Sequence, residues 1–263
     1  MVHVKIKAEH LFWLGPLDVT NSIVGAILAA AVLFLGMLLI FGGGSIVPGR
    51  VQGFVEFLFE FMSNIVRGQG GSRWRTAMPL IVTIFLFILL ANWLGLLPGV
   101  GTIGYYHESE EGERVLVPFI RAAGADLNFT LGLAIVSFVT FIALGVRVNG
   151  VGGYVKELAN PPYIAPIHVI SELSRLISLS MRLFGNVFAG EVLLIVIGTI
   201  APMAIFAFLG LELIFGAVQA LVFALLTMTY IALSTAEHHG VEEHESAAPG
   251  RGAAPEPIAP VAG

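Results

Sequence analysis

The chain has 263 residues, of which 57% are hydrophobic and only 12% are charged, and its formal net charge is −5. A soluble globular domain carries about 25% charged residues, so this composition excludes a soluble globule and indicates a polytopic membrane protein. Because there is no basic surplus and no cysteine, the composition also argues against nucleic-acid binding, disulfide bonds and a thiolate zinc site.

Three apolar segments predict near-vertical transmembrane helices over about 20–41, 77–97 and 127–146. Each has close to the 20 or so apolar residues that cross a bilayer core of about 30 Å. The first segment is predicted to be a retained span and not a signal peptide, because acidic residues precede it and no small-residue cleavage pattern follows it.

A different pattern occurs over about 48–66. Phe54, Phe57 and Phe61 recur at helical spacing, while Glu56 and Glu60 fall on another face. This predicts an amphipathic helix lying in the membrane interface. A helix packed against the protein's own spans is a second interpretation, and the two are compatible.

The charges of the connecting loops predict the orientation of the chain. Arg67 and Arg75 precede the second span and Arg147 follows the third, whereas the loop over 98–126 is rich in glutamate. Because cytoplasmic loops carry an excess of Lys and Arg, the glutamate-rich loop and the N-terminus are predicted to lie outside. The C-terminus is then predicted to be cytoplasmic.

The last third of the chain has unusually long apolar segments. No proline occurs between Pro166 and Pro202, and none follows until Pro249. Two helices of about 50 Å each would result at 1.5 Å per residue, so they must tilt or bend to fit a bilayer. We therefore expect a strongly tilted two-helix hairpin over about 163–235. Residues 1–238 are predicted to form one membrane domain, followed by a flexible polar tail over 239–263.

Ionisable and polar side chains lie inside this apolar hairpin. Each charge at membrane depth costs about 2.5–3.5 kcal/mol on insertion scales, and such residues commonly mark ion pathways. His168, Glu172, Arg175, Arg182 and Asn186 follow one another at helical spacing, so they form one stripe on a helix face. Glu172 and Arg175 are three residues apart and can form a local ion pair, which is a purely structural interpretation of both.

Arg182 has no acidic residue three or four positions away. A guanidinium group does not lose its charge in proteins, so Arg182 needs an anionic partner from elsewhere or contact with water. The alternative is that its side chain extends to the membrane interface.

Two glutamates complete the candidate pathway. Glu191 lies half a helical turn round from Arg182, and Glu212 shares a face with Gln219 and Tyr230 of the second long helix. Glu191 and Glu212 can approach each other across the hairpin, and a pair of close or buried carboxyl groups suits a proton relay. For Glu212 and Gln219, polar contact between helices is the structural alternative.

The sequence around these residues closely resembles subunit a of the F-type ATP synthases. The resemblance is carried by S-L-S-M-R-L-F-G-N-V-F-A-G-E over 178–191, A-N-W-L-G-L-L-P-G over 91–99 and Q-A-L-V-F…T-x-x-Y over 219–230. The order of segments agrees over about 10–238. The resemblance implies a stator with two offset half-channels that lead protons to and from a ring of c subunits. It also implies a b-subunit peripheral stalk and other ATP synthase subunits as partners.

The resemblance implies a role for each polar residue of the hairpin. Arg182 matches the arginine that meets the deprotonated ring carboxylate and blocks direct leakage. Asn186 and Gln219 match polar neighbours of that arginine, and Glu191 and Glu212 match the titratable pair of the outer half-channel. Many relatives have histidine at one of those two positions, so the relay here departs from the common pattern. Where the family often has an acid, this chain has His168, and Glu172 one turn later can substitute for it.

We therefore predict an all-α integral membrane protein that translocates protons without being an enzyme itself, in a bacterial plasma membrane. No cofactor or metal is expected, and the remaining partners are membrane lipid and the translocated ion. Na⁺ is an alternative coupling ion, because the ion-binding carboxylate lies on the ring. Two other functions compete with this one. A secondary transporter would use Arg182 to hold an anionic substrate, and a structural scaffold would use the buried charges only to pair helices.

Overall fold

The computed structural model describes residues 9–14, 17–42, 49–69, 74–101, 103–108, 114–159, 163 and 165–235. The tail predicted over 239–263 lies outside these residues. Within them, five helical segments are long and apolar enough to cross a membrane. They comprise α1 (Asn21–Gly42), α3 (Trp74–Gly95), α4 (Leu127–Ala159), α5 (Ala165–Ile200) and α6 (Ile205–Ser234) with the short turn η3 (Pro202–Ala204) that precedes it.

The first two predicted spans agree with α1 and α3, and the third agrees with the first part of α4. A second helical stretch continues to Ala159 beyond a kink at Gly150, whose φ of 71° and ψ of 159° are not helical. Only glycine adopts such a backbone conformation without steric cost. Arg147 and Asn149 end the apolar pattern in the sequence, and the kink at Gly150 directly follows Asn149.

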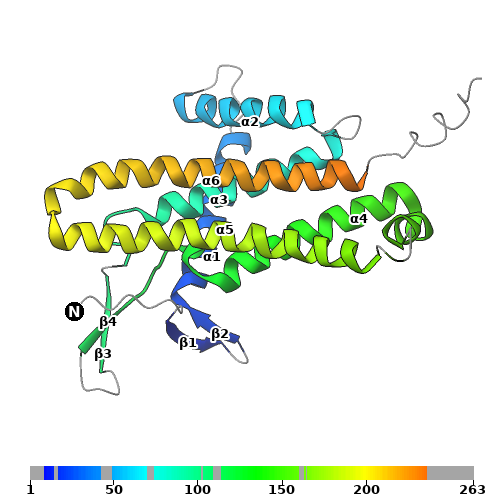
Figure 1. Cartoon of the computed structure of the whole chain (residues 1–263). Helices are drawn as coiled ribbons and strands as arrows, with labels where there is room; N and C mark the ends of the chain where they lie inside the picture. The colour runs from blue at the N-terminus through cyan, green and yellow to red at the C-terminus, as the bar shows by residue number, and fades with distance from the viewer. Residues whose placement is uncertain are drawn as a thin grey trace, which may run out of the picture.

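Two small antiparallel hairpins were not part of the all-α prediction. Strand β1 (His10–Leu14) pairs with β2 (Leu17–Thr20), and β3 (Gly104–Glu108) pairs with β4 (Arg114–Pro118). Both hairpins lie on the same side of the helices (Figure 1). An isolated two-stranded hairpin is marginal in water, and here the Tyr105 hydroxyl links the two by donating to the His10 carbonyl oxygen at 3.4 Å. The prediction is correct for the spans and incomplete for the loops.

The long hairpin is confirmed as a pair of helices joined near Pro202. Helices α5 and α6 run side by side, and α1 passes across them from the β1–β2 hairpin toward α2 (Arg50–Gln69) on the opposite side (Figure 1). The 3-10 turn η3 (Pro202–Ala204) reverses the chain between them. Proline suits this position because its missing N–H is not needed at the start of a helix.

Helix α2 packs against the protein's own helices. Met62 and Val66 are fully buried, and α2 contacts α3 and α6. Phe54 and Phe57 remain exposed on the helix. The packing interpretation of this segment is therefore confirmed, and its exposed aromatic side chains are compatible with the interfacial one.

The core lies around α3 and α6, whose contact is as extensive as that between α4 and α5. Ile81 and Ile88 of α3 and Phe223 of α6 are fully buried there. Two side chains of α3 also bind the α6 backbone. The Asn92 amide donates to the Gly216 carbonyl oxygen at 3.1 Å, and the Trp93 indole donates to the Leu213 carbonyl oxygen at 3.1 Å. These bonds fix the position of α6 relative to the core.

Candidate ion-translocation site

The N-terminal half of α5 contains the predicted local ion pair. Arg175 Nη1 and Glu172 Oε1 are 2.7 Å apart, and the Arg175 guanidinium lies 5.3 Å from the centre of the Tyr230 ring on α6. The charge of Arg175 is thus balanced within its own helix. His168, two turns before Arg175 on the same stripe, is exposed and makes no hydrogen bond or ion pair with the described residues.

Arg182 has a different environment from Arg175. It lies near the middle of α5, with about 25 Å of helix on either side at 1.5 Å per residue. Its side chain is exposed, and no hydrogen bond or ion pair joins it to any residue that the structure describes. The cation therefore faces away from the protein's own core.

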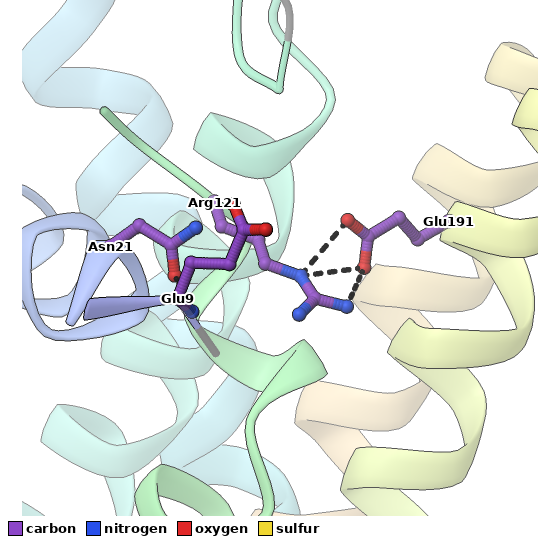
Figure 2. Close-up of polar contacts among 4 residues, drawn as sticks. All are labelled: Glu9, Asn21, Arg121 and Glu191. Atoms are coloured by element: carbon purple, nitrogen blue, oxygen red, sulfur yellow. Dashed lines mark hydrogen bonds and ion pairs between the residues drawn. The ribbon is translucent and has the colours of Figure 1, made fainter. Parts of the chain in front are cut away.

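Glu191 is bound by Arg121, an arginine of the loop over 98–126 that was not among the predicted site residues. Arg121 Nε lies 3.0 and 3.1 Å from the two carboxylate oxygens of Glu191, and Arg121 Nη2 lies 2.9 Å from Oε2. Figure 2 shows this two-pronged contact, which joins the segment after β4 to α5. The Arg121 side chain is 6% exposed and the Glu191 side chain 26%. A separation of 70 positions along the chain left no local pattern by which to find this pair.

Glu212 is buried and lies against the backbone of α5. Its carboxylate occupies the space that a side chain at Gly190 would need. No hydrogen bond or ion pair joins it to the described part of the chain. Gly190 directly precedes Glu191, so the two helices meet next to both acidic residues, but the predicted approach of the two carboxyl groups to each other stays a prediction. The Glu191 carboxylate, however, is bonded to Arg121.

Three buried amide atoms lack a hydrogen-bond partner among the described residues. They are Nδ2 of Asn186, Nε2 of Gln219 and Oδ1 of Asn92. Gln219 and Glu212 are both buried on α6. Asn92 on α3 was not among the predicted site residues. Because buried polar groups are nearly always hydrogen-bonded, such atoms indicate contact with water or with a group outside this chain.

A recess of about 390 Å³ lies between the N-terminal half of α5 and the end of α6. Its polar lining comes from Ser171, Ser174, Ser178, Arg175 and Tyr230. Along α5 the residues that line this recess come before Arg182, and Gly190 and Glu191 come after Arg182. Polar regions therefore lie on both sides of Arg182. Within the described residues, no group of three or more His, Cys, Asp or Glu side chains is placed to hold a metal ion.

The amino-acid sequence of this chain is similar to those of known proteins. A family model described as ATP synthase A chain matches residues 23–232. The chain is 35% identical to ATP synthase subunit a of Gloeobacter violaceus over 235 residues, which cover 88% of this chain and 90% of that one. It is 35% identical to ATP synthase subunit a of Mycobacterium marinum over 240 residues, covering 86% and 92%. The subunit of Mycobacterium ulcerans is 38% identical over 202 residues, covering 73% and 78%.

Proposed function

The chain belongs to the ATP synthase subunit a family, and from this premise we propose that it conducts protons through the membrane sector of a rotary ATP synthase. It is a non-catalytic membrane subunit, so ATP is made elsewhere in the complex. Its proposed partners are a ring of c subunits, a b-subunit peripheral stalk and the surrounding lipid.

The exposed and unpaired Arg182 is the observation that carries this proposal. A guanidinium group stays charged, and a charge at membrane depth needs a counter-charge or water. No described residue of the chain supplies the counter-charge. A carboxylate on a ring of partner subunits would supply it each time a deprotonated site passes. The cation then attracts that carboxylate and repels a proton that would cross directly between the two half-channels.

The polar regions on either side of Arg182 are the proposed half-channels. Glu212 lies on the outer side with Glu191, and Asn186 and Gln219 are the proposed polar neighbours of the arginine. The serine-lined recess lies on the other side, next to Glu172 and His168. Each proton that crosses a potential of 100 mV releases about 2.3 kcal/mol, which the offset between the two half-channels converts into rotation of the ring.

The orientation in the membrane follows from the loop charges. We place the two β hairpins outside and the Arg-rich connection between α2 and α3 in the cytoplasm of a bacterial cell. The α1 helix then runs close to the membrane normal, and the α5–α6 pair, which it crosses, is strongly tilted.

The experiment is to compare native and Arg182→Ala complexes in sealed vesicles. An imposed pH gradient drives ATP synthesis, and passive proton flux is measured with the catalytic sector removed. Arg147→Ala, an exposed arginine on α4, is the matched control. We expect Arg182→Ala to assemble normally, to lose synthesis and to leak protons, while the control behaves as the native complex. Normal coupled synthesis in Arg182→Ala refutes the proposal, and lost assembly favours a structural scaffold.

A further inference from the structure

The two acidic residues of the outer half-channel have different surroundings, and this difference assigns them different tasks. We propose that Arg121 is a positioning residue that holds Glu191 as a permanent anion, and that Glu212 is the carboxyl group that carries the proton there. This inference rests on the proposed function and divides the work within its outer half-channel.

Arg121 is held firmly in the position from which it reaches Glu191. Its backbone N–H donates to the Asn21 carbonyl oxygen at 3.4 Å, and its own carbonyl oxygen occupies the space that a side chain at Gly25 would need. The methyl group of the next residue, Ala122, occupies the space that a side chain at Gly95 would need. Close contacts with both α1 and α3 therefore hold the segment in place.

The N-terminal segment closes the other side of the pair. Glu9 and Asn21 are joined by two hydrogen bonds, from the Glu9 N–H to Asn21 Oδ1 at 3.2 Å and from the Asn21 N–H to the Glu9 carbonyl oxygen at 3.1 Å. Figure 2 shows Glu9 beside Arg121, so Glu9 is a second acidic residue at this place. The Arg121 side chain lies between the N-terminal segment and α5 and is 6% exposed.

Protonation of Glu191 would neutralise the carboxylate that accepts hydrogen bonds from Nε and Nη2 of the buried Arg121. Arg121 cannot respond by losing its own charge, and removing one partner of a buried ion pair is strongly unfavourable. Glu191 is therefore poorly suited to accept and release a proton once per ring step. Its fixed negative charge instead attracts protons toward the outer half-channel.

Glu212 has no such constraint. No described residue forms an ion pair or hydrogen bond with its carboxylate, so a proton can bind and leave without breaking a contact. One turn further along α6, Gly216 contacts Asn92 of α3, and Gln219 follows one turn later. The side-chain amides of Asn92 and Gln219 each have one buried atom without a hydrogen-bond partner among the described residues. The proton passes from outside water to the Glu212 carboxylate and then to the ring carboxylate, and Glu191 keeps its charge throughout.

A double-mutant cycle on the assembled complex in vesicles tests the proposal. The variants are Arg121→Gln, Glu191→Gln and the two combined, and ATP-driven proton pumping and pH-driven synthesis are measured for each. Each single change removes one charge of the Arg121–Glu191 pair and leaves the other, and should slow transport about tenfold, whereas the combined variant should recover most of that loss. Arg121→Lys, which keeps the charge, should retain more activity than Arg121→Gln.

Two further variants make the outcome specific. Glu212→Gln should stop transport, and adding Arg121→Gln should not restore it. Glu60→Gln, an exposed glutamate on α2, is the control for loss of one acidic group and should behave as the native complex. If the single variants fail to assemble, the combined variant still decides the matter, because both charges of the Arg121–Glu191 pair are replaced in it.

The proposal is overturned if the combined variant assembles but transports as slowly as Glu191→Gln, because Glu191 must then carry the proton itself. It is also overturned if Glu212→Gln pumps at the native rate. Failure of the broader function is recognised separately, since coupled synthesis in Arg182→Ala refutes the stator mechanism whatever the cycle shows.

Discussion

Replacing Gly190 with alanine tests whether the position of the Glu212 carboxylate sets the rate of proton transfer. A methyl group at this position would overlap the carboxylate carbon and both oxygens of Glu212. The carboxylate is the end of a flexible side chain, so it can rotate away and the backbone helices need not separate. The change therefore displaces one functional group while it leaves the fold in place.

The expected energetic effect on folding is small. Alanine is favoured over glycine inside a helix by about 1 kcal/mol, and a side chain forced about 30° from its preferred rotamer costs about 0.5–1.5 kcal/mol. These two terms nearly cancel, so assembly and thermal stability should stay close to native. A displacement of a reacting group on the order of 1 Å, by contrast, costs up to about 100-fold in rate.

The assay is ATP-driven proton pumping in vesicles, with assembly checked on the purified complex. We expect Gly190→Ala to slow pumping by about 10- to 100-fold. Gly132→Ala on α4 is the matched control, because a side chain there meets nothing within 4 Å. Combining Gly190→Ala with Glu212→Asp should restore part of the rate, since the shorter acid leaves room for the methyl group. A native pumping rate in Gly190→Ala would refute the reasoning.

Three further substitutions test the packing of α6 and the ion pair within α5. Phe223→Ala empties a fully buried site on α6 and should cost about 3–5 kcal/mol, seen as a fall in the thermal midpoint of the complex. Thr227→Val removes the acceptor of a buried hydrogen bond from Ser137, 2.8 Å long, and should cost about 0.6–1.7 kcal/mol by the same measurement. Glu172→Gln breaks the partly exposed pair with Arg175 and should change stability by less than about 1 kcal/mol; a larger loss would show that the pair supports the fold.

Exposed counterparts serve as controls for the first two changes. Phe206 is 76% exposed, so Phe206→Ala should leave the thermal midpoint nearly unchanged. Among the described residues, the exposed Thr199 hydroxyl bonds only to the Ile195 carbonyl of its own helix, so Thr199→Val should cost less than Thr227→Val. Equal effects in the exposed and buried members of either pair would contradict the packing described for α6.

The features that were predictable from the sequence all depend on residues close together in the chain. The apolar spans, the long pair of helices joined near Pro202 and the ion pair of Glu172 with Arg175 each follow from composition or helical spacing within a few turns. Arg182 also stood out locally, because no acid lies three or four positions from it. A helix repeats every 3.6 residues, so its faces are readable from the order of residues alone.

The remaining features depend on residues that are distant in the chain. Glu191 and Arg121 are separated by 70 positions, and nothing in either segment specifies the other as its partner. The unpartnered oxygen of Asn92 and the fit of Glu212 against Gly190 likewise exist only where separate helices meet. Ion pairs, buried amides and close backbone contacts are set by distances of a few ångströms between elements, and only the packing of α1, α3, α5 and α6 together creates those distances.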